Sequence, residues 1–395
     1  MQRLTRLIGI GYLAICLLAL LATTFVAPLG YAPFPLQIGP AREPVVLTVW
    51  YGTEKRAWLE EAAARFAQGD PRVGGRPVRV VLRGIGSREQ AERVASQRWG
   101  GEPPPAVISP ASSMWLEVLR GAWAARNPGA PPVLPEGADA PAPLALTPLV
   151  LVAWEERGPL IWRGEEGFWQ ELAGALARRN WSELGGREEW GPVKLGHTSP
   201  LTSNSGAQAL VLLAYGYHGK AAGLTIADVS SAGFRAWLAG VESAVPAFSD
   251  STGALVTSML QRGPSMYDAA VVYENLAIES FEAARAWGGL RVYYPPATAL
   301  SDHPYAILNA PWVTPAEREA ARQFRAFLLS RPIQERARAH GFRPADPGVP
   351  IVSDDPANPF NRYQANGLRA DIQQQAEPPT ADVLAALLDL WQELR

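Results

Sequence analysis

Apolar residues between positions 45 and 120 follow two spacings in alternation. Val45–Tyr51 is a run of β-branched and aromatic residues, which is typical of a strand. In Lys55–Ala67, apolar side chains recur on one helical face, which predicts a helix. The alternation continues with strands at Val78–Leu82 and Pro105–Ser109, and with helices at Arg88–Trp99 and through Trp115, Leu116 and Leu119. Strands and helices in alternation favour a mostly parallel sheet with helical crossovers, so we expect an α/β fold.

The same pattern continues to the C-terminus. Further strands are expected at Leu149–Trp154, Val193–Gly196, Ala269–Tyr273, Leu290–Tyr294 and Tyr305–Leu308. Because Gly206–Tyr217 is apolar almost all round, it predicts a buried helix. Thr314 and Glu317 have the spacing of a capping box, with a proline at the first helical position, which predicts a helix start. A last amphipathic helix opens at Thr380, and its apolar stripe can pack on its own domain, which we favour, or dock a partner.

The N-terminal segment has the pattern of an export signal. Arg3 and Arg6 precede an uncharged run of 20 residues, Leu7–Val26, which is about 30 Å long as a helix. Basic residues before the run and none directly after it place the N-terminus inside and the rest of the chain outside. Residues 1–31 are expected to be a cleaved signal peptide or a retained membrane anchor, with the length favouring the anchor. Residues 32–44 are then a proline-rich linker, and the protein belongs to the cell envelope, anchored or secreted.

Composition excludes several classes of function. With 36 basic and 38 acidic residues, a net charge of −2 and no basic stripe, nucleic-acid binding is not expected. A single cysteine, Cys16, excludes a disulfide framework and a zinc site built on several thiolates. The four histidines lie far apart without metal-ligand spacing. Because no nucleophile elbow, Walker A or dinucleotide-binding pattern is present, we predict a non-enzymatic protein with no catalytic residue, metal or cofactor.

The most informative polar segment is Gly196–Gly206, whose hydroxyl and amide side chains lead into the expected buried helix. A helix N-terminus offers unpaired N–H groups and a partial positive charge, so with neighbouring hydroxyls it can hold an anion or a polar ligand. Simple N-capping by Ser203 or Ser205 is the competing interpretation. A second polar loop, Ser249–Gly253, precedes another apolar helix, where a capped helix start is an equally good explanation.

Other candidate residues follow the expected strands. Ligands of open α/β sheets bind beyond the carboxyl ends of the strands, and the turns that begin at Tyr51 and Ser109 lie at such ends. Tyr273 and Glu274 end a further strand, although Glu274 can equally be a surface carboxylate.

Six segments, in this order, resemble bacterial extracellular solute-binding proteins of the type II periplasmic-binding fold. They span residues 45–345, and the helix pair that ends in Gly341–Pro344 is the most specific match. The segments are VVLTVWYG, PPAVISPASSMWLEVL, KLGHTSPLTSNSGAQALVLLAY, GPSMYDAAVVYENLAI, YYPPATALSDHPYAIL and APWVTPAEREAARQFRAFLLSRPIQERARAHGFRP.

The resemblance implies two α/β lobes, each a mostly parallel sheet flanked by helices. Lobe I would comprise residues 45–145 and 300–345, lobe II residues 146–299, and residues 346–395 a C-terminal extension that ends in the amphipathic helix. The chain would cross between lobes near 144–151 and 294–299. The resemblance also implies which residues contact the ligand. They are Thr53, Ser109 and Ser112 on lobe I, and Ser203, Ser205, Ser251, Thr252, Tyr273 and Glu274 on lobe II.

The leading functional hypothesis is capture of a small polar or anionic solute between the lobes, in partnership with an ABC-type permease. The alternative is a membrane-anchored interaction or sensing module, because the stretch from Asn366 to Trp391 resembles the segment that precedes a von Willebrand factor A domain in some larger relatives. In that case the partner is a protein with a von Willebrand factor A domain. A hydrolase or transferase is the weaker third hypothesis.

Overall fold

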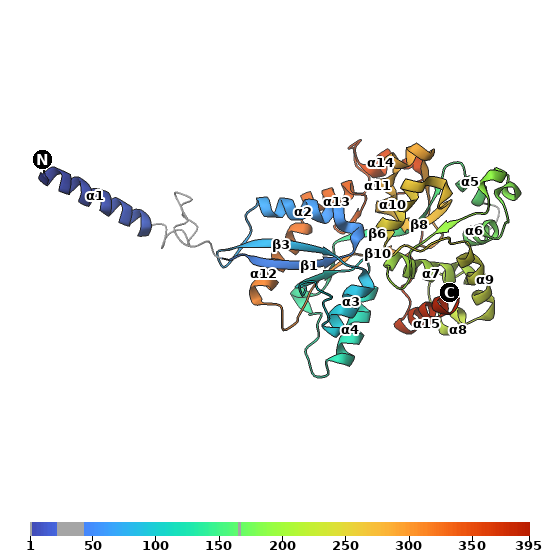
Figure 1. Cartoon of the computed structure of the whole chain (residues 1–395), viewed down its shortest axis with the longest axis horizontal. Coiled ribbons are helices and arrows are strands. Elements are labelled where there is room, and N and C mark those ends of the chain that lie inside the picture. The colour runs from blue at the N-terminus through green and yellow to red at the C-terminus, as the bar shows by residue number, and fades with distance from the viewer. Residues whose placement is uncertain (1, 22–42, 165–166) are drawn as a thin grey trace.

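The computed structural model describes residues 2–21, 43–164 and 167–395 (Figure 1). Helix α1 (Gln2–Leu21) comes first. Within these residues, no helix combines the length and the apolar character that a membrane span requires. The expected apolar run extends to Val26, so its last part, together with residues 27–42, lies outside the described residues.

The first sheet has six strands in the order β2–β3–β1–β4–β11–β5. Its bounds are β1 (Val45–Tyr51), β2 (Arg72–Val73), β3 (Arg76–Gly84), β4 (Val107–Ser109), β5 (Ala142–Pro143) and β11 (Pro304–Ile307). The central strand β1 pairs in parallel with β3 and β4, as the alternation predicted. Strand β11 comes from the returning chain and runs antiparallel to β4, so the sheet is mixed.

Helices cover both faces of this first sheet (Figure 1). They are α2 (Arg56–Gln68), α3 (Ser87–Ser96), α4 (Met114–Arg126), α12 (Pro315–Leu328) and α13 (Arg331–Ala339). The rings of Phe66 on α2 and Phe324 on α12 pack with centroids 5.0 Å apart. A helix from the start of the fold is thus packed against a helix from the returning chain. The Thr314–Glu317 capping box is present at the start of α12, as predicted.

The second sheet is built around the ten-residue strand β6 (Ala145–Trp154). Strands β8 (Ala269–Tyr273) and β9 (Leu290–Tyr293) run antiparallel to it, and among the strands of this sheet in the described residues only β7 (Leu195–Gly196) forms a parallel pair, with β8. The expectation of a mostly parallel second sheet is therefore wrong. Helix α11 (Glu274–Ala284) connects β8 to β9, and these two strands run in the same direction. They do not pair with each other, because β6 lies between them and runs in the opposite direction.

Strand β6 begins where the chain enters the second sheet from the first. Its first residues pair with β10 (Leu300–Ser301) and β12 (Arg343–Pro344), and its last residues pair with β8 and β9. The chain thus passes between the sheets near residues 144–148, 300–303 and 342–345, and Figure 1 shows β6 and β10 at the centre of the molecule. We call the sheet of β1 with its helices the first lobe and the sheet of β8 with its helices the second lobe.

The second lobe carries the remaining helices. They are α5 (Gly158–Ile161), α6 (Phe168–Leu176), α7 (Asn204–His218), α8 (Ile226–Val229), α9 (Ala232–Ser243) and α10 (Thr252–Arg262), with α14 (Pro359–Arg362) and α15 (Ala381–Glu393) from the tail. Every residue of α7 from Asn204 to Tyr215 is buried, as its apolar composition predicted. The apolar stripe of α15 is buried on α7 and α8, so the tail helix packs on its own chain rather than presenting that stripe to a partner.

Candidate functional site

Five turns from the two lobes meet around one small polar cavity. Two belong to the first lobe, after β1 and β3, and three belong to the second, at the starts of α7 and α10 and at the end of β8. The cavity has a volume of about 20 Å³, which is space for one water molecule. Its lining residues are Gly52, Thr53, Glu54, Gly86, Ser87, Thr202, Ser203, Asn204, Asp250, Ser251, Thr252 and Tyr273.

The turn after β1 places a carboxylate in this cavity. Residues Thr53–Lys55 form a 3₁₀ turn, and the N–H of Gly52 donates to the carbonyl of Ser109, which holds the turn against β4. A Cβ at position 52 would lie 2.4 Å from Oε1 of Glu54, so only glycine leaves space for the Glu54 carboxylate to fold back over the chain.

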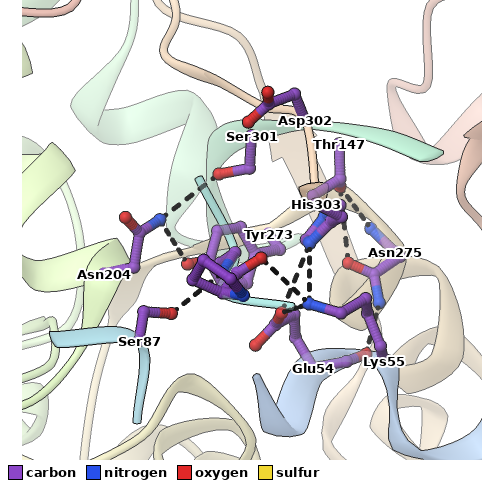
Figure 2. Close-up of polar contacts among 12 residues, drawn as sticks. Glu54, Lys55, Ser87, Thr147, Asn204, Tyr273, Asn275, Ser301, Asp302 and His303 are labelled. Atoms are coloured by element: carbon purple, nitrogen blue, oxygen red, sulfur yellow. Dashed lines mark hydrogen bonds and ion pairs between the residues drawn. The ribbon is translucent and has the colours of Figure 1, made fainter. Parts of the chain in front are cut away.

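Glu54 is part of a buried charged cluster (Figure 2). Nζ of Lys55 lies 2.6 Å from Oε1 of Glu54 and 3.2 Å from Nδ1 of His303. Burial opposes ionisation of Glu54, but the charge of Lys55 and the contact with His303 outweigh it and hold the pKa of Glu54 at about 2. Glu54 and Lys55 therefore form an ion pair near neutral pH.

His303 completes this cluster from the returning chain. Burial and the positive charge of Lys55 lower the pKa of His303, so the ring is neutral and Nδ1 can accept a hydrogen bond from Lys55. The residue has a φ of 43°, in the left-handed region, and its N–H donates to the carbonyl of Ala111. The chain therefore holds His303 in a strained conformation at the point where it re-enters the first lobe.

Asn204 links the two lobes through its side-chain amide. Its Oδ1 accepts a hydrogen bond of 2.7 Å from the indole of Trp115 on α4, and its Nδ2 donates to the hydroxyls of Tyr273 and Ser301 at 2.8 and 3.3 Å (Figure 2). A second link between the lobes runs from Nδ2 of Asn275 to the carbonyl of Glu54, at 3.1 Å. The bond from Trp115 thus crosses between the lobes, whereas the bond to Tyr273 lies within the second lobe.

Three helices begin at the cavity. The hydroxyl of Ser251 caps α10 by accepting from the N–H of Ala254. At α7 the N-cap residue Ser203 makes no such bond, because its hydroxyl lies 3.2 Å from that of Ser205. Helix α3 begins after Gly86, which has no side chain to cap it. The positive ends of α3 and α7 therefore face the site without a capping side chain.

The structure brings five of the nine expected contact residues to the cavity and places four elsewhere. Thr53, Ser203, Ser251, Thr252 and Tyr273 line the cavity. Ser205 lies just behind it, where its hydroxyl bonds to Thr198 and Thr252 at 2.8 and 2.7 Å.

The other three expected residues have interior roles. The hydroxyl of Ser109 is buried and has no partner among the described residues. Oγ of Ser112 accepts from the N–H of Met114. Glu274 is fully buried and forms two bonds of 2.8 Å with Arg343, so it is neither a surface carboxylate nor a lining residue.

Sequence analysis did not single out Glu54, Lys55, Ser87, Asn204, Asp250 or His303. Glu54, Asn204 and Asp250 do lie within or beside the polar turns that it identified, so position alone could have indicated them. His303 lies 248 residues beyond Lys55 in the sequence, and only the pairing of β11 with β4 brings the two together.

A larger hollow of about 630 Å³ lies on the second lobe, between β9, the α5–α6 segment and the tail. Trp162 and Tyr293 border it, with their rings stacked at 4.3 Å. The tryptophans of this region pack within the second lobe, and none of them lines the interlobe cavity.

Two α/β lobes with a polar site between them define a two-lobed binding protein. Residues 47–343 match the family model described as "Bacterial extracellular solute-binding protein", and the chain belongs to this family. Its members are binding proteins rather than enzymes. No match was found among the curated proteins.

Solved structures of binding proteins share the fold. The sulfate-binding protein SubI of Mycobacterium tuberculosis H37Rv is 17% identical, with 85% of this chain and 94% of that chain covered and a TM-score of 0.52. A periplasmic thiamin-binding protein is 13% identical, with 92% and 99% covered and a TM-score of 0.58. The ferric ion-binding protein A of Pasteurella haemolytica is 12% identical, with 88% and 97% covered and a TM-score of 0.56. The chain therefore has the periplasmic-binding-protein fold, as the resemblance implied.

Proposed function

We propose that this protein is an extracytoplasmic solute-binding protein that captures a small polar solute between its lobes and delivers it to an ABC-type importer. The family supports the general role, and the observation that carries the site is the convergence of five polar turns from both lobes on one cavity. Hydroxyls, amides and helix N-termini are the groups that orient a small solute by hydrogen bonding.

Binding requires the lobes to open and close. In the structure the cavity holds no more than one water molecule, and bonds from Trp115 to Asn204 and from Asn275 to Glu54 join its two sides. A solute therefore enters only when the lobes separate, and the strands β6, β10 and β12 are the connections about which they would turn. The closed surface formed around the solute would be the one that a permease recognises.

A binding screen of the full chain tests the proposal. Sugars, amino acids, amines and inorganic anions would be tested by thermal shift. Solutes that raise the melting temperature would then be measured by calorimetry. Thr53→Val removes a hydroxyl from the cavity while keeping the side-chain shape, and Thr257→Val, on the exposed part of α10, is its matched control. We expect Thr53→Val to weaken binding and Thr257→Val to leave it unchanged. Binding of no solute, or equal binding by both variants, would refute the interlobe site.

The comparisons lend no support to a von Willebrand factor A partner, and the tail helix that suggested a docking surface is packed on α7 and α8. The signal or anchor segment, the linker and the boundaries of lobes I and II given above stay parts of this proposal. A membrane position would follow from residues 1–31 if they act as an anchor.

A further inference from the structure

The two lobes meet through contacts between the protein's own groups. Trp115 of the first lobe donates to Asn204 of the second at 2.7 Å, and Asn275 of the second lobe donates to the carbonyl of Glu54 in the first at 3.1 Å. The cavity left between them has a volume of about 20 Å³, which is space for one water molecule. Protein side chains therefore fill most of the space between the lobes at this point.

The neighbours of Asn204 fix the orientation of its amide. Nδ2 of Asn204 donates to the hydroxyls of Tyr273 and Ser301, as Figure 2 shows. The hydroxyl of Ser301 in turn donates to Oε1 of Gln208, one turn further along α7, at 3.0 Å. Because the Ser301 hydrogen is used in this bond, Ser301 can only accept from Asn204. Oδ1 of Asn204 is therefore directed to the indole of Trp115, which can only donate.

The bond between Trp115 and Asn204 is enclosed, since each of these residues is only 2% exposed. If one of the two groups lost its partner while the lobes stayed closed, the other would be buried without a hydrogen bond. When the lobes separate, water can solvate both groups. The bond therefore stabilises the closed form relative to the open form for as long as both partners are present.

Asn204 also occupies part of the space in which a solute would be held. It lines the cavity together with Ser203 and Tyr273, and its amide lies between Tyr273 and Trp115. A solute larger than a water molecule must gain space between the lobes, and the amide is in its way. Breaking the bond to Trp115 then lowers the apparent affinity for that solute, because a closed form without solute competes with the bound form.

From these contacts, and resting on the proposed function, we propose that Asn204 is a positioning residue whose amide closes the lobes without a solute, and that the solute binds by displacing this amide from Trp115. The amide thus takes the place of the solute in the closed form. Removal of the Asn204 side chain should open the lobes and leave a position that a free amide can fill.

The test uses the full chain and supplies the missing amide from solution. Asn204→Gly removes the CH₂ group together with the amide, which leaves room for formamide between Trp115 and Tyr273. Asn358→Gly is the matched control, because Asn358 is also buried but its amide bonds to Ile351 and Phe360 within the tail. The wild type and both variants are measured by small-angle X-ray scattering alone, with formamide, and with formate, which has a similar shape but no N–H donor.

We expect Asn204→Gly to have a larger radius of gyration than the wild type, and formamide to restore the wild-type value. Formate should not restore it, and Asn358→Gly should match the wild type throughout. Asn204→Leu fills the same space without hydrogen bonding, so it should be open and insensitive to formamide. Circular dichroism first establishes that each variant is folded, and Asn204→Leu tests closure if Asn204→Gly does not fold.

An unchanged radius of gyration in folded Asn204→Gly or Asn204→Leu would overturn the proposal, because the amide would then not hold the lobes closed. An increase in Asn204→Gly that formamide does not reverse would also overturn it. A merely structural role of Asn204 predicts no such reversal by formamide.

The displacement step is tested with any solute that the binding screen identifies. Asn204→Gly should bind that solute more tightly than the wild type in calorimetry, because no amide has to be displaced. Weaker binding would overturn displacement and show that the amide itself holds the solute. The scattering experiments need no solute, so binding of no solute in the screen would refute the proposed function and leave the role of Asn204 in closure intact.

Discussion

The indole N–H of Trp115, on α4 of the first lobe, donates a 2.7 Å hydrogen bond to Oδ1 of Asn204 at the start of α7 on the second lobe. Both side chains are buried, and Asn204 also holds the hydroxyl of Tyr273. The amide of Asn204 therefore contacts both the first lobe, through Trp115, and a residue that lines the cavity, Tyr273.

Removing this donor should favour the open form. Trp115→Phe keeps an aromatic ring but leaves Oδ1 of Asn204 without a partner in the closed form, at a cost of about 1–3 kcal/mol. Because water can solvate the amide once the lobes separate, we expect a larger radius of gyration by small-angle X-ray scattering. Trp287→Phe, which removes an exposed indole N–H that bonds within the second lobe, is the control. An unchanged radius of gyration in Trp115→Phe would contradict this role.

Gly86 is expected to permit close approach of the lobes. A Cβ at this position would lie 2.9 Å from the carbonyl oxygen of Thr202, although its φ of −56° is open to any residue. Gly86→Ala should therefore hinder closure and weaken solute binding by about tenfold, without a large change in the melting temperature. Gly121→Ala, where the added methyl group meets nothing within 4 Å, is the matched control. Equal affinity in the two variants would show that the lobes do not approach here.

The tail is attached to the second lobe through Glu242, which gives a prediction about pH. Glu242 accepts bonds from His197, Trp391 and Arg395 at 3.0, 2.9 and 2.8 Å. Burial opposes ionisation of Glu242, but the interactions with His197, Trp391 and Arg395 outweigh it and lower its pKa. A carboxyl whose pKa is lower in the folded state stabilises the fold above its unfolded pKa, about 4.3, and this contribution is lost as pH falls through the folded value.

We therefore expect Glu242→Gln to lower the free energy of unfolding at pH 7. The difference from wild type should shrink as the pH is taken below about 4, where Glu242 itself becomes protonated. Urea denaturation at several pH values measures this, with Glu393→Gln, in an exposed pair with Arg235, as the control. A difference that stays constant down to pH 2 would mean that ionisation of Glu242 does not contribute.

The buried pair of Glu274 and Arg343 is predicted to hold the start of α11 against β12. Arg343 also donates to the carbonyl of Arg369 in the tail, and Tyr294 donates to Glu274, so the pair is fully enclosed. Arg343→Met should lower the free energy of unfolding by about 3–5 kcal/mol, because it leaves a buried carboxylate without a counter-ion. The double variant Arg343→Met/Glu274→Leu should lose less than the single one in chemical denaturation. Additive losses would indicate that the two side chains are not coupled.

Local signals predicted most of the elements. Helical spacing gave α2, the capping box gave α12, and the all-apolar run gave α7, because each depends on residues close together in the sequence. The expectation of a mostly parallel second sheet was wrong, since the direction of a pair depends on which strand lies beside it. Strand β6 separates β8 from β9, and no spacing within either strand reveals that.

Short-range patterns were enough to predict which segments become strands and helices and which polar turns lie at the cavity, because hydrogen bonding and apolar periodicity act over a few residues. The tertiary structure alone decided that Glu54, Lys55 and His303 form one buried cluster, that Glu274 faces Arg343 instead of a ligand, and that two carboxylates line the cavity. Charge and burial at a site depend on residues brought together from distant parts of the chain, and that proximity exists only in the folded molecule.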